Sequence, residues 1–333
     1  MATDQQPDFA ARYANLASPR LGSEVAFATD DFFAPRERLI ADSDPVFIAG
    51  KYDENGKWMD GWETRRRRDG GHDWCLVRLG VRGIVRGVDI DTRHFTGNFP
   101  PSAGLEGCLS DGEPGDGAIW TPLVPVTRLG PDAHHYVGVE HGEPVNWLRL
   151  RIFPDGGVAR LRVYGEPRPD WSGIGADEPV ELSGLANGGR IVACNDAHYG
   201  TLWSLLGAGR AASAGDGWET RRRRRPGNDW IIIALGCAGL VERIEVDTRH
   251  FKGNYPDMCS VLATHAGDAV EDTLVAQSMF WDELMAPRKL GADEVHRFGP
   301  EALSRLGPVT HIRLNIFPDG GVSRFRVFGT LAR

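Results

Sequence analysis

The chain has 333 residues, of which 41% are hydrophobic and 25% are charged, and its formal net charge is −8. This composition excludes wholesale disorder and collagen-like repeats, and the acidic balance argues against nucleic-acid binding, which gains affinity by neutralising phosphates. No run approaches the ~20 apolar residues that span a bilayer, and the first residues lack the features of a secretory signal. We therefore expect two domains in a cytoplasmic protein that binds neither nucleic acid nor membrane.

A long internal repeat organises the chain. Asp60–Pro100 and Asp216–Pro256 are identical at 24 of 41 positions without a gap, and Arg149–Gly165 recurs as Arg313–Gly329. This period is far longer than the roughly 20–50 residues of a solenoid unit, so each copy is expected to be a domain. The predicted order is a first repeat over 1–165, a linker rich in Pro, Gly and acids over 166–181, and a second repeat over 182–333.

Taken in chain order, the patterns favour strands. β-Branched or alternating runs predict strands over 83–92, 147–153, 158–165 and 230–236. The PDGG sequence between the second and third of these is typical of a hairpin turn. Short helices are predicted only over 34–41 and 279–286, and the variable stretches 101–147 and 257–311 are expected to hold long loops. The fold class predicted is all-β, with two tandem antiparallel sandwiches or jelly rolls.

The run WETRRRR occurs in both copies and carries the first candidate residues. In an extended strand Glu63, Arg65 and Arg67 share one face, and arginine on both faces excludes an ordinary buried strand. The planar guanidinium suits bidentate binding of a carboxylate. The alternative is an edge strand whose arginines pair with neighbouring acids. Glu219 and Arg221 hold the same places in the second copy.

The run DTRHF-x-GN, also present twice, follows a predicted strand and enters a loop. His94 and His250 have a side chain suited to proton transfer near neutral pH, and Asn98 and Asn254 follow a glycine that permits a tight turn. The alternative is a buried hydrogen-bonded corner that only fixes the loop. Lys252 replaces Thr96 in the second copy, so the copies differ here.

Metal signatures are weak. His134, His135 and His141 are close in sequence, but no His-Glu-x-x-His run accompanies them. The five cysteines include no Cys-x-x-Cys pair, so neither a disulfide framework nor a thiolate zinc site is supported. No metal ligand set is predicted, no cofactor is indicated with certainty, and a bound divalent metal stays an open alternative.

The run GKWMDGWETRRRRDGGHDW followed by DIDTRHFTGNFP resembles the allantoicase family, as do TDDFF and the two RIFPDGG and NIFPDGG turns. The resemblance covers both repeats. It implies two jelly-roll domains of the galactose-binding type, assembly into homo-oligomers, and hydrolysis of allantoate to ureidoglycolate and urea in purine degradation.

Allantoate carries one carboxylate and two ureido groups on a single carbon, which calls for a cation together with paired donors and acceptors. The resemblance and the residue chemistry together suggest acid–base roles for Glu63, His94, Glu219 and His250. Substrate-binding roles are suggested for Arg65, Asn98, Arg221, Asn254, Asp30 and Lys252. Asp30 also fits a turn residue that bonds its own backbone. Which copy is catalytic stays open.

The sequence also permits two alternative functions. The first is a non-catalytic pair of carbohydrate- or ligand-binding jelly rolls, because fold does not imply function; its stacking platforms would be Trp62, Trp74, Trp218 and Trp230. The second is a ureidoglycolate-cleaving lyase, whose products would be glyoxylate and urea.

Overall fold

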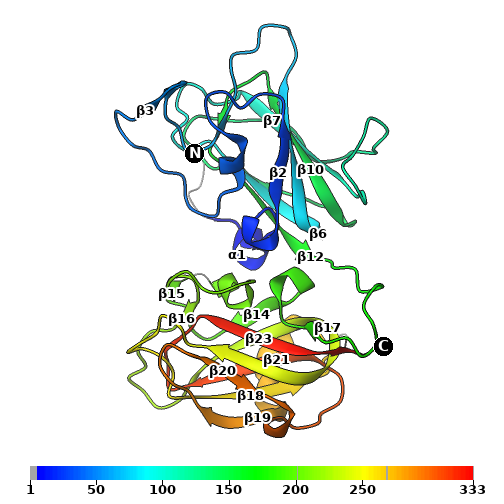
Figure 1. The fold of residues 1–333 in the computed structure, drawn as a ribbon, viewed down its shortest axis with the longest axis vertical. Helices are drawn as coiled ribbons and strands as arrows, with labels where there is room; N and C mark the ends of the chain where they lie inside the picture. Colours follow the sequence, from blue (N-terminus) through cyan, green and yellow to red (C-terminus); the bar gives the residue numbers. More distant parts are fainter. Residues whose placement is uncertain (1–5, 201, 268, 333) are drawn as a thin grey trace. The chain divides into compact units, whose positions relative to one another are not determined.

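The chain folds into two compact all-β units, Met1–Pro169 and Asp170–Arg333 (Figure 1). The computed structural model describes residues 6–200, 202–267 and 269–332. Within these ranges, no helix has both the length and the apolar character needed to cross a membrane.

The described residues of unit 1 form short helical turns and twelve strands. Its helices are α1 (Asp8–Arg12) and the 3-10 helices η1 (Pro19–Leu21) and η2 (Arg36–Ile40). Its strands are β1 (Ala14–Asn15), β2 (Glu24–Ala28), β3 (Tyr52–Asp53), β4 (Gly56–Lys57), β5 (Trp62–Glu63), β6 (Asp73–Asp91), β7 (Ser102–Cys108), β8 (Thr121–Arg128), β9 (Tyr136–Gly138), β10 (Val145–Phe153), β11 (Gly157–Val158) and β12 (Arg160–Pro167).

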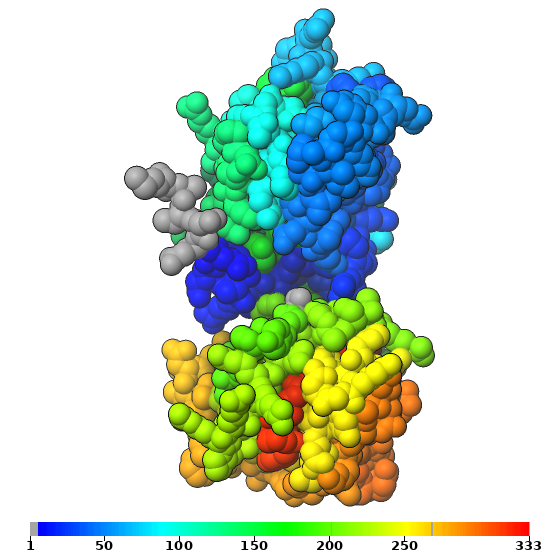
Figure 2. All heavy atoms as spheres, turned by 90° about the vertical axis from the view of Figure 1, so that its left-hand side faces the viewer, coloured from blue at the N-terminus to red at the C-terminus, as the bar shows by residue number. Residues whose placement is uncertain are grey.

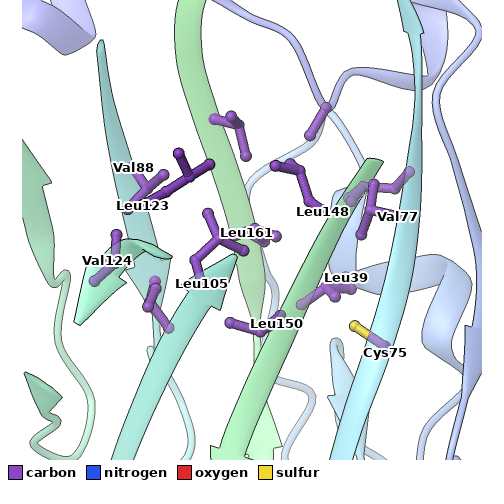
Figure 3. Packing of buried hydrophobic residues seen from close by; sticks show 14 of the residues in the cluster. Leu39, Cys75, Val77, Val88, Leu105, Leu123, Val124, Leu148, Leu150 and Leu161 are labelled. Carbon is purple, nitrogen blue, oxygen red and sulfur yellow. The ribbon is translucent and has the colours of Figure 1, made fainter. Parts of the chain in front are cut away.

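The 19-residue strand β6 organises unit 1. Its first half pairs with β2 and β10, and its second half pairs with β9 and β12, all antiparallel. The sheet continues from β10 to β7 and β8. Because successive side chains of a strand point to opposite faces, alternate residues of these strands enter the interior. Figure 3 shows such residues, among them Val77, Leu105 and Leu150, meeting in one apolar core with Leu39 of η2.

Unit 2 repeats this plan. Its strands are β13 (Val180–Glu181), β14 (Arg190–Cys194), β15 (Tyr199–Gly200), β16 (Trp218–Glu219), β17 (Asp229–Asp247), β18 (Met258–Thr264), β19 (Asp282–Lys289), β20 (Val295–Phe298), β21 (Val309–Phe317), β22 (Gly321–Val322) and β23 (Arg324–Leu331). Its helices are α2 (Glu271–Gln277) and the 3-10 helices η3 (Leu185–Asn187), η4 (Leu202–Leu206), η5 (Ser278–Phe280) and η6 (Pro300–Ala302). The strand β17 pairs with β14, β20, β21 and β23, as β6 does with its counterparts. In Figure 2, atoms of β23 (red) are visible on the surface of unit 2 between green and yellow segments.

The structure confirms the all-β prediction and corrects three local ones. The helix expected over 279–286 is wrong, because residues 282–289 form β19, whose pairing with β18 overrides the local pattern. The PDGG hairpin is also wrong: β10 and β12 each pair with β6, and the second glycine begins β11, which pairs with β5. The stretch 101–147 contains strands β7 to β9 as well as loops.

Candidate active site

The short strand β5 fixes Glu63 at the border of the core. Its neighbour Trp62 is fully buried and donates its indole N–H to the Asp30 carbonyl at 2.8 Å. The backbone of Glu63 exchanges hydrogen bonds with Ala34 on one side and pairs with Gly157 on the other. Burial of Trp62, and of Trp218 in unit 2, makes both core residues and excludes them as sugar-stacking platforms.

The carboxyl of Glu63 is held by Asn98. Only 9% of Glu63 is exposed, and the Asn98 side-chain amide donates to Glu63 Oε1 at 2.6 Å. Burial raises the pKa of Glu63, because the charged form loses hydration, and the Asn98 hydrogen bond opposes part of this effect. The result is an oriented carboxyl that stays protonated to higher pH than an exposed glutamate.

His94 is held in an uncommon backbone conformation beside this pair. Its φ of 71° is left-handed, and its backbone N–H donates to Asp132 Oδ1 at 2.8 Å. The ring Nε2 lies 3.1 Å from the carbonyl of Pro45, and Phe47 stacks on the ring at 6.1 Å. Because a carbonyl only accepts, Nε2 must carry the proton, so in the neutral ring Nδ1 has a free lone pair. Non-glycine residues with such φ values are costly and cluster at functional sites.

These side chains line one hollow of about 360 Å³ in unit 1. This volume lies within the range of about 300–1,000 Å³ for small-molecule sites. The floor is apolar, since Met59 packs with the fully buried Phe95. The residues that line the hollow are Phe33, Lys57, Met59, Glu63, His94, Thr96, Gly97 and Asn98.

The FPDGG turn holds the loops beside this hollow in place through hydrogen bonds, a role that the sequence did not suggest. Asp155 accepts the backbone N–H of Arg67 at 2.8 Å, and the N–H of Gly157 donates to the Asn98 carbonyl at 2.7 Å. A Cβ on Gly157 would lie 2.0 Å from the ring of Phe95, so only glycine allows this close approach. The repetition of FPDGG in both copies is the sequence feature that could have indicated this role.

Three of the four arginines of WETRRRR have carboxylate partners within unit 1. Arg65 donates from Nε and Nη2 to Asp30 Oδ1 at 2.8 and 2.6 Å, and Arg67 pairs with Asp69 and Asp73. Asp30 also accepts the backbone N–H of Arg65. Neither Arg65 nor Asp30 lines the hollow, so the structure joins these two candidates to each other and leaves them outside it.

Unit 2 contains the same contacts in a more exposed setting. Asn254 donates to Glu219, His250 adopts a φ of 70° with Nε2 2.9 Å from the Ala211 carbonyl, and Arg221 pairs with Asp196 at 2.8 Å. Lys252 lies 3.8 Å from Asp293. Glu219 is half-buried whereas Glu63 is buried, and His250 and Asn254 are exposed whereas His94 and Asn98 are half-buried.

In the part of the chain that the structure describes, one group of side chains has metal-ligating chemistry. Ligand atoms of Asp89, Asp91 and His134 lie within 4.8 Å of one another. Arg93 already pairs with Asp91 at 2.8 Å, and Asp89 accepts from His134 Nδ1 at 2.6 Å. A divalent cation here would be repelled by the Arg93 guanidinium, so these residues do not fit a resident metal.

Comparisons with known proteins identify the family of the chain. The model of the allantoicase repeat family matches residues 14–168 and 180–332. The chain is 55% identical over 327 residues to probable allantoicase 2 of Burkholderia pseudomallei, covering 98% of this chain and 97% of that protein. It is 53% identical to a probable allantoicase of Ralstonia nicotianae over 98% and 97% of the two chains. The crystal structure of allantoicase from Saccharomyces cerevisiae superposes with a TM-score of 0.77 at 32% identity, covering 95% of this chain and 92% of that one. The resemblance seen in the sequence is confirmed, and the chain belongs to the allantoicase family.

Proposed function

We propose that this protein hydrolyses allantoate to ureidoglycolate and urea, and that the hollow of unit 1 is its active site. The observation that carries the proposal is the buried Glu63, oriented by Asn98, in the same hollow as His94. A carboxyl whose pKa is raised by burial and an imidazole with a free lone pair can serve as the acid and base that cleavage of a carbon–nitrogen bond needs.

The proposed chemistry assigns one task to each group. His94 Nδ1 takes a proton from water as the water oxygen bonds to the central carbon. Glu63 gives its proton to the nitrogen of the departing ureido group, which leaves as urea. Proton exchange through solvent then returns His94 and Glu63 to their starting forms. Asn98 donates to Glu63 through one N–H, so its Oδ1 is available to accept from a ureido N–H.

Unit 1 is favoured as the catalytic copy because its candidate side chains are less exposed to solvent than those of unit 2. Electrostatic and acid–base groups act more strongly where solvent is excluded. Glu63, His94 and Asn98 are each less exposed than Glu219, His250 and Asn254. We therefore assign a structural role, the stabilisation of loops in unit 2, to the corresponding residues there: Glu219, His250, Asn254, Arg221 and Lys252.

Three wider features belong to the same proposal. The family relationship supports a homo-oligomer, and the acidic chain without a membrane-spanning helix among its described residues is compatible with a cytoplasmic enzyme. The two repeats are assigned to residues 1–165 and 182–333, with 166–181 between them.

The decisive assay measures urea released from allantoate by the purified full chain, with ureidoglycolate and glyoxylate quantified separately. Equal amounts of urea and ureidoglycolate are expected; glyoxylate in place of ureidoglycolate would instead indicate the lyase. Glu63→Gln should lower kcat/KM by about 10²-fold or more, and by more than Glu219→Gln does. Folded protein that releases no urea, also with divalent metals added, would refute the proposal. Repeating the assay after treatment with a chelator tests for a contribution from a bound cation.

A further inference from the structure

We propose that Lys57 binds the carboxylate of the substrate, and that a ten-residue insertion in the first repeat creates this binding site. The inference rests on the proposed function and names the residue that selects an anionic substrate. It replaces Arg65, whose guanidinium already binds Asp30.

The insertion is located by contacts that the two units share. His94 contacts the carbonyl of Pro45 as His250 contacts that of Ala211. Asp60 and Asp216 are equivalent in the same way, because each pairs with a buried arginine of the last strand of its unit. Pro45 and Asp60 are 15 positions apart, whereas Ala211 and Asp216 are 5 apart. The ten extra residues of unit 1 therefore lie between Pro45 and Asp60.

This insertion forms one side of the hollow. It contains the hairpin of β3 and β4, and Lys57 is the last residue of β4. Figure 2 shows segments coloured for residues near 50 beside segments coloured for residues near 100 on the surface of unit 1, in agreement with the residues that line the hollow. At the same offset, unit 2 has Ser213 in place of Lys57 and Gly215 in place of Met59.

The hairpin is anchored, which gives Lys57 a defined place. The N–H of Val46 donates to Asp60 at 3.0 Å where the insertion begins, and Arg38 donates to the Met59 carbonyl at 2.9 Å where it ends. Lys57 Nζ lies 4.7 Å from the centre of the Phe47 ring, and that ring stacks on His94. The ammonium group is thus held at the rim of the hollow, on the side where His94 lies.

Lys57 lines the hollow and has no acidic partner among the described residues, whereas the nearby arginines of WETRRRR lie outside the hollow. Arg65 and Arg66 pair with Asp30 and Asp155. Among the described residues, no carboxylate lies within 4.0 Å of Lys57 Nζ. Its charge nevertheless reaches the catalytic carboxyl, since Lys57 helps to lower the pKa of Glu63 against the larger effect of burial. In unit 2 the lysine of the DTRHF loop, Lys252, lies near Asp293 and is partly neutralised by it.

A substrate with one carboxylate and two ureido groups fits this arrangement of charges. With its carboxylate on Lys57, a ureido group can extend toward Asn98 and Glu63 in the interior of the hollow. This contact does not change as the carbon–nitrogen bond breaks, so it contributes equally to binding of substrate and transition state. Its loss should raise KM and leave kcat nearly unchanged.

The test compares Lys57→Met and Lys57→Arg in the full-length protein. Lys57→Met should raise KM for allantoate by about tenfold or more, with kcat within about threefold, and Lys57→Arg should recover most of the loss because it keeps the charge. The matched control is Lys51→Met, in the same insertion. Lys51 Nζ lies over the ring of Trp58 at 3.7 Å and does not line the hollow, so KM should stay within about twofold.

A second readout uses the carboxamide analogue of allantoate as a competitive inhibitor. The wild-type protein should bind allantoate more tightly than this neutral analogue, and Lys57→Met should abolish the preference. An unchanged KM and an unchanged preference in Lys57→Met, with active wild-type protein, would overturn the assignment of Lys57 and leave the proposed reaction intact. Absence of urea release by the wild-type protein would instead count against the proposed function itself.

Discussion

The matched glycines Gly157 and Gly321 allow the catalytic copy to be identified without changing any reacting group. An alanine Cβ at Gly157 would lie 2.0 Å from the ring of Phe95, and at Gly321 the same distance from the ring of Phe251. Ordinary contacts are 3.4–4 Å, and both rings are fully buried, so the ring and the loop that carries it must move by more than 1 Å. We expect each substitution to cost about 1–3 kcal/mol of unfolding free energy by overpacking.

The two variants should differ in activity although they match in stability. Phe95 follows His94 directly, so Gly157→Ala should displace the catalytic loop and lower kcat/KM by about 10²-fold. Gly321→Ala should stay within a few-fold of wild type. Urea-induced unfolding followed by tryptophan fluorescence gives the stability, and urea release from allantoate gives the activity. A larger loss of activity in Gly321→Ala would place the active site in unit 2, and two destabilised but fully active variants would separate both loops from catalysis.

Three further predictions concern charge. Glu63→Gln keeps an acceptor for Asn98 and removes a carboxyl that burial makes costly to ionise, so at pH 7 it should be more stable than wild type by about 0.5–2 kcal/mol although less active. Because burial raises the pKa of Glu63, the folded wild type holds this proton above the pH at which the unfolded chain loses it. The extra stability of Glu63→Gln should therefore vanish near pH 4, where both states of the wild type are protonated. Unfolding measured as a function of pH tests this, and extra stability that persists at pH 4 would contradict the argument. The hydrogen bond to Asp89 raises the pKa of His134, so the stability lost in His134→Gln should be greatest below pH 6.5 and shrink as the pH rises through the folded-state pKa; a difference that grows toward pH 9 would refute it. Arg65→Gln should raise KM for allantoate less than Lys57→Met does, because Asp30 already binds this guanidinium, and the reverse order in steady-state kinetics would restore Arg65 as the carboxylate-binding residue.

The sequence predicted the all-β class, and it named Glu63, His94 and Asn98 as residues of interest. It could do so because strands and their turns depend on local patterns, and because the repeat displayed each motif twice. The helix expected over 279–286 failed for the opposite reason: hydrogen bonds to β18 come from residues distant in the chain, and they outweigh local preference.

The charge partners of the site were harder to predict. Arg65 is attractive for an anion until Asp30, 35 residues away, is seen to bind it. Lys57 attracted no attention because the second copy has Ser213 at the same offset, so the repeat does not mark this position as a lysine. Only the folded chain shows that its ammonium reaches the hollow. Pairing of charges over long sequence separations is a property of tertiary packing, which periodicity and motif spacing do not report.

The long strand β6 has a consequence for the order of events during synthesis. Its partners range from β2, which precedes it, to β12, which ends at Pro167. The second half of β6 therefore lacks its neighbours until nearly all of unit 1 has been translated, and contacts of such long range form slowly. Every one of these partners nevertheless lies within unit 1, so this unit can complete its sheet while the ribosome is still producing unit 2. Tandem duplication thus keeps the slowest strand pairings of each copy within a nascent segment of about 170 residues.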